Sequence, residues 1–235
     1  MRELAELANQ AFGIELNEEQ LLRFTVYERV LLEWNDKVNL TAIRDKRGIL
    51  IKHFLDSLSC ALAIQEPPES LIDIGSGAGF PGLVLKIFYP SARVVLADSI
   101  GKKARFCELA AREMGFNDVL SLPARAEELG NDPAHRGRYQ WVTARAVARL
   151  PILLEYLLPL AKVGGMVLAQ KGATAQEELD DSSNALSKLG GMLDRVVPIH
   201  LPELEDERSL IVIKKVSPTP RIYPRLAGIP AKKPL

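Results

Sequence analysis

The sequence predicts an α/β protein in which an N-terminal helical region precedes a mixed seven-stranded sheet. Apolar residues keep helical spacing over residues 1 to 64, and from Leu71 short apolar strands alternate with helices. The last two strand candidates follow each other without a helix between them. Alternation of strands and helices favours a parallel sheet, and the final pair favours an antiparallel edge.

The N-terminal region carries recognisable helix signals. Asn17 with Gln20 has the pattern of a capping box, and Asp45 can cap a further helix. Pro67-Pro68 ends the helical part. We therefore expect a helical region at 1–66, a sheet domain at 67–216 and a C-terminal tail at 217–235.

The elements of the sheet domain follow from the periodicity. Strands are expected at Leu71–Ile74, Arg93–Ala97, Val119–Leu122, Trp141–Ala144, Met166–Ala169, Asp194–Ile199 and Ser209–Lys215. Helices are expected at Pro81–Phe88, Ile100–Met114, Leu150–Leu160 and Thr174–Leu189. The proline-rich, basic tail is predicted to be extended on the surface.

The composition is that of an ordinary soluble globular chain of 235 residues, with 47% hydrophobic and 26% charged residues. The formal net charge of zero gives no global field that would attract a nucleic acid. Cys60 and Cys107 lie in apolar helical patterns, which predicts buried free thiols. No apolar run suits a membrane span or a signal peptide, so we expect a cytoplasmic protein. We also expect a monomer.

The segment Leu71–Gly82 is the most informative motif. A buried strand runs into a turn with glycines at every second position, beginning at Gly75. The dinucleotide fingerprint requires a sixth-position glycine, but Phe80 stands there, which disfavours a diphosphate. Asp98 ends the next strand, where a carboxylate can accept both ribose hydroxyls. The motif therefore favours a nucleoside ligand without a diphosphate.

The turn beginning at Asp73 and the acid at Asp98 resemble those of class I S-adenosylmethionine-dependent methyltransferases. Over nearly the whole chain, the motifs resemble the bacterial small-subunit (16S) rRNA guanine-N7 methyltransferases, the glucose-inhibited division protein B family. The matching segments are Asn39–Thr41, His53–Ser57, Gly75–Gly82, Asp98–Ser99, Gly101–Lys103, Arg145–Ala146, Lys171–Gly172 and Gly228–Lys232. The resemblance implies methylation of a guanine in the decoding-region loop, with 16S rRNA or the small ribosomal subunit as partner.

The resemblance also implies a binding site for S-adenosyl-L-methionine. Its expected residues are Asp73, Gly75, Gly77, Gly79, Phe80, Asp98, Ser99, Ile100, Ala126, Glu127 and Arg145. Three of them have other interpretations. Glu127 fits a solvated first helical turn, Arg145 fits a buried partner of Asp73, and Asp73 itself suits either the turn's N–H groups or the methionine ammonium.

Guanine N7 has a lone pair and no proton to remove, so positioning can supply most of the acceleration and no obligatory general base is expected. Because N7 must stay free, the base is expected to be read by its Watson–Crick edge and by stacking. The candidates for the acceptor pocket are Arg145, Lys171, His53 and Asp56. His53 equally suits a structural role, and three scattered histidines predict no metal site.

Basic residues cluster locally despite the neutral total. The candidates for RNA binding are Arg44, Lys46, Arg47, Lys102, Lys103, Arg221, Arg225, Lys232 and Lys233. We expect these runs to form a path for phosphates along one rim, although a charge run is usually a solvated face.

Two other classes of function remain open on the sequence. One is a methyltransferase that acts on a small molecule or a protein, and the other is an RNA-binding module with a degenerate cofactor turn. A nicotinamide oxidoreductase is disfavoured because Phe80 breaks the fingerprint.

Overall fold

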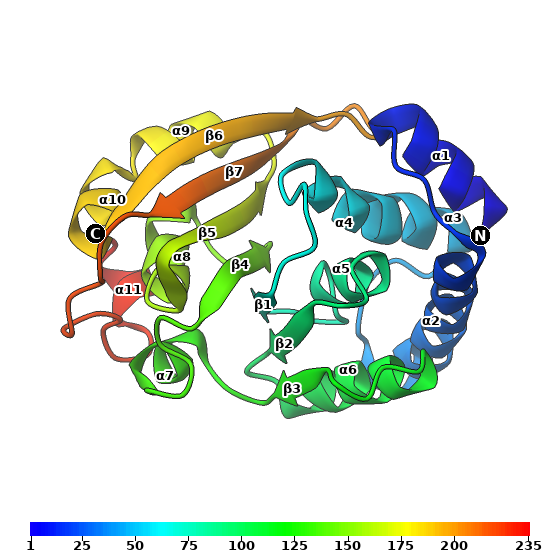
Figure 1. Ribbon diagram of the computed structural model, residues 1–235, viewed down its shortest axis with the longest axis horizontal. Coiled ribbons are helices and arrows are strands. Elements are labelled where there is room, and N and C mark those ends of the chain that lie inside the picture. The colour runs from blue at the N-terminus through cyan, green and yellow to red at the C-terminus, as the bar shows by residue number, and fades with distance from the viewer.

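The computed structural model describes residues 1–235 and contains one seven-stranded sheet, in the order β3-β2-β1-β4-β5-β7-β6 (Figure 1). The strands are β1 Ser70–Ile74, β2 Arg93–Ala97, β3 Leu120–Leu122, β4 Tyr139–Arg145, β5 Ala161–Lys171, β6 Gly191–Ile199 and β7 Arg208–Lys215. Strands β1 to β5 are parallel, whereas β7 runs antiparallel to β5 and to β6. The predicted mixed sheet with an antiparallel edge is confirmed.

The N-terminal helices are α1 Arg2–Phe12, α2 Glu18–Val38, α3 Lys46–Gly48, η1 Ile49–Leu55, α4 Asp56–Leu58 and η2 Ser59–Leu62. The predicted capping box is confirmed, since Gln20 N donates to Asn17 Oδ1 and Asn17 N donates to Gln20 Oε1, both at 2.9 Å. Asp45 caps the third helix by accepting from Gly48 N. That helix then continues through the π-helical turns of η1 and ends in the 3₁₀ turn η2.

The other helices are α5 Gly82–Phe88, α6 Gly101–Glu113, α7 Ala126–Asn131, α8 Leu150–Leu157, α9 Ala175–Asp180, α10 Ser183–Leu189 and α11 Ile229–Lys232. The single helix predicted over Thr174–Leu189 is wrong, because the chain turns at Asp181-Ser182 between α9 and α10. Buried Ser182 bonds there to the Glu178 carbonyl, a local contact that competes with helix continuation. No helix is both long and apolar enough to cross a membrane.

Successive strand residues point to opposite sides of the sheet, and the central strands are buried on both faces. Leu71 packs with the N-terminal helices, α5 and α6, while Ile72 packs with α8 and α10. In Figure 1 the first group of helices lies on the right of the sheet and the second group on the left. Cys60 and Cys107 are buried free thiols, as predicted.

The C-terminal tail follows its prediction only in part. Most of its residues are exposed and lie outside helices and strands, but Tyr223, Pro224 and Pro230 are buried and the short helix α11 packs beside α8 (Figure 1). The proline-rich composition indicated an open chain, but the Arg136 guanidinium donates to three tail carbonyls and to the Gly130 carbonyl of α7.

Candidate functional site

The glycine turn after β1 is held from the N-terminal helices. Gly75 and Gly79 have φ of 68° and 92°, a left-handed conformation that glycine adopts without strain. The Tyr27 hydroxyl of α2 donates to the Ala78 carbonyl within the turn. A Cβ at Gly79 would lie 2.7 Å from the Tyr27 oxygen, so the turn and α2 approach as closely as glycine allows.

Asp98 supports the same turn from the end of β2. Its Oδ2 accepts from Gly77 N at 2.9 Å and its Oδ1 from Ile100 N at 2.8 Å. The carboxylate is therefore fixed between the glycine turn and the start of α6. Each oxygen keeps a further lone pair, and Asp98 lines a cavity together with Ser99.

Asp73 lies beneath the turn and lines neither of the two cavities at the carboxyl ends of the strands. It is fully buried, and it accepts from Gly82 N at 2.9 Å and from the Thr143 hydroxyl at 3.2 Å. Burial raises the pKa of Asp73 to about 7, although both hydrogen bonds act in the opposite direction. Asp73 was expected either to hold the N–H groups of the turn or to reach the methionine ammonium. The structure shows its bond to a backbone N–H, that of Gly82.

The first cavity has a volume of about 260 Å³ and opens at the carboxyl ends of β1 and β2. The α7 residues Ala126 and Glu127 form one side, and Ile152 and Tyr156 of α8 form another. Ala231 of α11 also lines it. Glu127 lies in the first turn of a helix, as expected if it were a solvated helix residue. Its side chain is buried, however, which a solvated residue would not be. The cavity brings together the end of β2, the start of α7 and the C-terminal segment.

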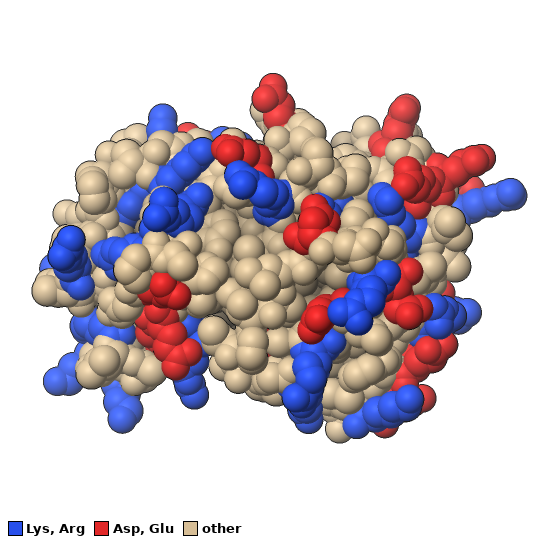
Figure 2. Space-filling model, turned by 60° about the horizontal axis from the view of Figure 1, so that its bottom comes forward, with Lys and Arg blue, Asp and Glu red and all other residues tan.

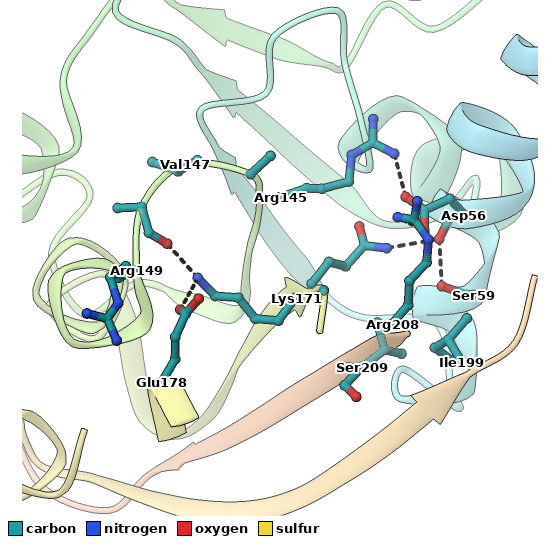
Figure 3. A pocket seen from close by; sticks show the side chains of 15 residues that line it. Asp56, Ser59, Arg145, Val147, Arg149, Lys171, Glu178, Ile199, Arg208 and Ser209 are labelled. Atoms are coloured by element: carbon teal, nitrogen blue, oxygen red, sulfur yellow. Dashed lines mark hydrogen bonds and ion pairs between the residues drawn. The ribbon is translucent and has the colours of Figure 1, made fainter. Parts of the chain in front are cut away.

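The second cavity, of about 390 Å³, adjoins the first at the loop after β4, because Val147 and Ala148 line both. Figure 3 shows Arg145 and Arg208 converging on Asp56. Arg145 Nη1 donates to Asp56 Oδ2 at 2.7 Å, and Arg208 Nη1 lies 3.3 Å from Oδ1. Arg145 therefore pairs with Asp56, and its expected pairing with Asp73 is wrong.

Two buried polar atoms in this second cavity have no hydrogen-bond partner within the chain. They are the acceptor Gln170 Oε1 and the donor Arg208 Nε. The Gln170 amide is oriented by its Nε2, which donates to the Asp56 carbonyl at 2.9 Å. Unpaired buried polar atoms are costly, so the pair suits a polar ligand.

His53 contacts the arginine of this cavity from the π-helical stretch η1. Arg145 Nη2 lies 3.4 Å from His53 Nδ1, and because arginine only donates, Nδ1 is the accepting nitrogen. His53 Nε2 then donates to the Thr41 hydroxyl at 2.7 Å. Burial and the Arg145 charge lower the pKa of His53 to about 4, so the ring is neutral at pH 7.

Phe80 lies between the glycine turn and this cluster. Its ring stacks on His53 at 4.5 Å and on Tyr27 at 5.3 Å between centroids, and the Arg145 guanidinium lies 5.1 Å from its centre. Phe80 is 4% exposed and lines neither cavity. Phe80 was expected to contact the cofactor, but the structure places it behind the cavities, where it packs against Arg145 of the second cavity and against Tyr27, which holds the glycine turn.

Lys171 points away from the two arginines, towards α9 (Figure 3). Its Nζ lies 2.8 Å from Glu178 Oε2 and also donates to the Ala148 carbonyl. Burial acts to raise the pKa of Glu178, but hydrogen bonds from Lys171, Thr174 and the Leu150 N–H outweigh it and lower the pKa. Lys171 thereby fixes the loop that separates the cavities.

The remaining predicted residues divide into two groups. Gly75 lines the first cavity, whereas Gly77, Gly79 and Ile100 support it through the turn. Among the RNA-binding candidates, Arg44, Arg47 and Arg225 make ion pairs with Asp36, with Glu3 and Glu203, and with Glu155 respectively. No acidic partner lies within ion-pair distance of Lys46, Lys102, Lys103, Arg221, Lys232 or Lys233.

Several site residues were not predicted from the sequence. They are Tyr27, Gln170 and Arg208, with Val147, Ile152, Tyr156 and Ala231. Two of them had a usable signal in the sequence. Ala231 lies in the matching segment Gly228–Lys232, and Arg208 is a cation directly before the strand expected at Ser209–Lys215. The others are ordinary helix, strand or loop residues that tertiary contacts bring to the cavities.

Comparisons with known proteins identify the family and the fold. The sequence profile of the family described as rRNA small subunit methyltransferase G matches residues 20–211. A ribosomal RNA small subunit methyltransferase G from Roseiflexus sp. (strain RS-1) is 50% identical over 226 residues, 96% of each chain. One from Roseiflexus castenholzii (strain DSM 13941 / HLO8) is 48% identical over 235 residues, the full length of both.

Among solved structures, the geranyl diphosphate C-methyltransferase from Streptomyces coelicolor A3(2), in complex with Mg2+, geranyl diphosphate and S-adenosyl-L-homocysteine, has a TM-score of 0.55. It is 15% identical, and the match covers 81% of this chain and 98% of that one. This likeness concerns the fold alone, which is the predicted class I S-adenosylmethionine-dependent methyltransferase fold. Since the family profile and the relatives span most of its length, the chain belongs to the rRNA small subunit methyltransferase G family.

Proposed function

We propose that this protein transfers a methyl group from S-adenosyl-L-methionine to N7 of a guanine in 16S rRNA, in the decoding-region loop. One observation carries the proposal. Two cavities at the carboxyl ends of the parallel strands share Val147 and Ala148, and ligands bind at such strand ends in open α/β sheets. The first cavity suits a methyl donor and the second a methyl acceptor.

The residues of the first cavity fit an adenosyl group. Asp98 has free lone pairs for ribose hydroxyls, and Ile152 with Tyr156 offers an apolar wall for a planar base. Glycine at position 75 lets the backbone of the turn come close to the Val147 side chain, since a Cβ at Gly75 would lie 2.5 Å from Val147 Cγ2. When bound, S-adenosyl-L-methionine supplies an electrophilic methyl group on a positively charged sulfur.

The residues of the second cavity would orient the acceptor. Arg145 and Arg208 are held by Asp56, and their remaining donors suit phosphate or carbonyl oxygens. The free acceptor Gln170 Oε1 and the free donor Arg208 Nε suit a base edge that presents both kinds of group. Lys171 would act on the acceptor only indirectly, because its ammonium group donates to the Ala148 carbonyl and fixes the loop that lines both cavities.

The chemistry requires no base from the protein. Guanine N7 offers a lone pair without a proton, so alignment of the reacting atoms is the main requirement. His53 is neutral and Asp73 is buried away from both cavities, which agrees with roles in support. If one substitution of Asp56, Asp73 or Glu127 abolished methylation while both substrates still bound normally, a required proton transfer would have to be considered.

The test is methylation with methyl-labelled S-adenosyl-L-methionine of three acceptors, namely naked 16S rRNA, small ribosomal subunits and a metabolite extract. We expect label in 16S rRNA, on one guanine that becomes sensitive to the cleavage chemistry specific for 7-methylguanosine. Comparison of naked RNA with subunits identifies the preferred acceptor. Label confined to metabolites or protein would refute the RNA assignment, and an absence of cofactor binding by calorimetry would favour an RNA-binding module.

A further inference from the structure

The C-terminal segment, residues 216–235, returns across the helices of the methyltransferase fold after β7. Arg136, in the loop after α7, donates to the carbonyls of Tyr223 at 2.7 Å, Thr219 at 2.8 Å and Pro220 at 3.1 Å. A single guanidinium therefore fixes the first half of the segment. It also donates to the Gly130 carbonyl at 2.6 Å, which ties the segment to α7.

Two further contacts fix the segment where it crosses α7. Asn131 Nδ2 donates to the Pro224 carbonyl at 3.1 Å and to the Glu127 carbonyl at 2.9 Å. The proline ring lies so close to α7 that a Cβ at Gly130 would meet it at 2.7 Å. The segment is therefore packed against α7 and does not merely lie near it.

An ion pair between partly exposed Arg225 and a buried carboxylate holds the segment to α8. Glu155 is fully buried, and Arg225 donates to it from its backbone N at 2.8 Å, from Nε at 2.9 Å and from Nη2 at 2.6 Å. Arg225 Nη2 also donates to the Lys233 carbonyl at 2.8 Å, which draws the end of the chain back. A buried carboxylate needs such a partner, so this contact fixes the path of the chain.

The segment reaches the first cavity beyond this ion pair. Gly228 N lies 3.3 Å from Glu127 Oε1, and the short helix α11 begins at the next residue. Ala231, in that helix, lines the cavity together with Glu127, Ile152 and Tyr156. Figure 1 shows α11 beside α7 and α8, far along the chain from the glycine turn.

The position of this wall identifies the part of the ligand that it covers. The transferred methyl group must lie towards the second cavity, at Val147 and Ala148. Asp98 suits the ribose, so the base lies beyond it, towards Glu127 and Tyr156. This is the end of the cavity that Ala231 lines.

We propose that the C-terminal segment is part of the cofactor site, with Gly228–Ala231 closing the cavity over the adenine of the adenosyl group. This inference rests on the proposed function, since it takes an adenosyl ligand as given. The segment excludes water from one side of the base, and Glu127 bridges it to α7. Because the segment and the ligand contact each other, each stabilises the other's bound position.

The experiment is calorimetric titration of the full chain with S-adenosyl-L-homocysteine and, separately, with adenosine. Ala231→Phe places a large side chain at the cavity, and Ala227→Phe is the matched control, because Ala227 is exposed in the same segment and lines neither the first nor the second cavity. We expect Ala231→Phe to raise the Kd of both ligands about tenfold or more, and the control to leave both unchanged. An equal effect on adenosine and S-adenosyl-L-homocysteine is expected because both contain the adenine.

Hydrogen exchange on the unmodified chain provides a test that does not depend on a variant folding. The amides of Lys232 and Lys233 bond to the carbonyls of Gly228 and Ile229, and their exchange should slow when S-adenosyl-L-homocysteine is added. Unchanged exchange, or equal Kd values for the two phenylalanine variants, would overturn the inference. Failure of the unmodified chain to bind the ligand at all would instead count against the proposed function.

Discussion

Asp73 shows how one buried carboxyl organises the glycine turn. Both of its oxygens are used within the fold, by the first N–H of α5 and by a β4 hydroxyl. Burial nevertheless raises its pKa to about 7, because the charged form loses more hydration than the two hydrogen bonds return. Its protonation is therefore linked to folding at pH values near neutrality.

The sign of this linkage gives a prediction. Between its ordinary pKa of 3.8 and about 7, Asp73 binds a proton in the folded chain and releases it on unfolding. Its contribution to the unfolding free energy therefore falls as pH rises through this window. Asp73→Asn keeps an acceptor for Gly82 N but cannot ionise, so the variant should lose less stability than the unmodified chain between pH 4.5 and 7. Urea unfolding across this range measures the difference, and identical pH slopes would contradict it.

His53 gives a second prediction at the residue scale. Burial and the Arg145 charge lower its pKa to about 4, so the ring stays neutral across the usual assay range. The methylation rate at saturating substrates should therefore show no inflection from His53 between pH 5.5 and 8. His53→Asn should lower the rate without changing the shape of the pH profile. An inflection near 6.5 that disappears in this variant would show that His53 titrates during the reaction.

At the scale of elements, α2 contributes to the cofactor site through Tyr27. The hydroxyl of this buried side chain donates to Ala78 in the glycine turn, so a helix outside the sheet domain holds the turn in place. Tyr27→Phe should lower the unfolding free energy by about 1 kcal/mol through the lost hydrogen bond. It should also weaken binding of S-adenosyl-L-homocysteine, because the turn loses an anchor.

Tyr89→Phe is the matched control for this prediction. The Tyr89 hydroxyl also donates to a buried backbone carbonyl, that of Ile64, but it lies away from both cavities. The control should lose a similar amount of stability and keep its affinity for the ligand. Calorimetry with both variants separates the two effects, and equal affinities would show that the turn needs no support from α2.

The elements that could be predicted from the sequence are those whose signals are local. Three such features were predicted, namely the glycine turn from Gly75, the acid Asp98 at a strand end and the capping box at Asn17. Each of them is recognised from residues only a few positions apart. The docking of the C-terminal segment was not predicted, because it depends on Arg136 meeting carbonyls more than eighty residues later in the chain. Arg208 likewise acquires its role only when β7 pairs with β5 and brings it to Asp56.

At the scale of the whole molecule, the zero net charge conceals an uneven surface. Figure 2 shows lysine and arginine side chains predominating on the left of this face, whereas both signs mix on the right. The left side is the one on which α7, α11 and the C-terminus lie in Figure 1. We expect the phosphates of an RNA with a base in the second cavity to meet this side.

Lys232 and Lys233 are the terminal cations of that side, and they test the phosphate path directly. Both are exposed and neither has an acidic partner within ion-pair distance. Each lysine that contacts a phosphate of single-stranded RNA adds about 0.7 to the slope of log Kd against log salt. Changing both to glutamine should weaken binding to a 16S rRNA fragment at low salt and flatten this slope, while S-adenosyl-L-homocysteine affinity stays unchanged.

The control is Lys37→Gln, which removes an exposed cation at the end of α2, on the opposite side of the molecule. It should leave the slope as it was. If the C-terminal double variant kept both the affinity and the slope of the unmodified chain, its two lysines would be a solvated face and the phosphates would follow another route to the cavity.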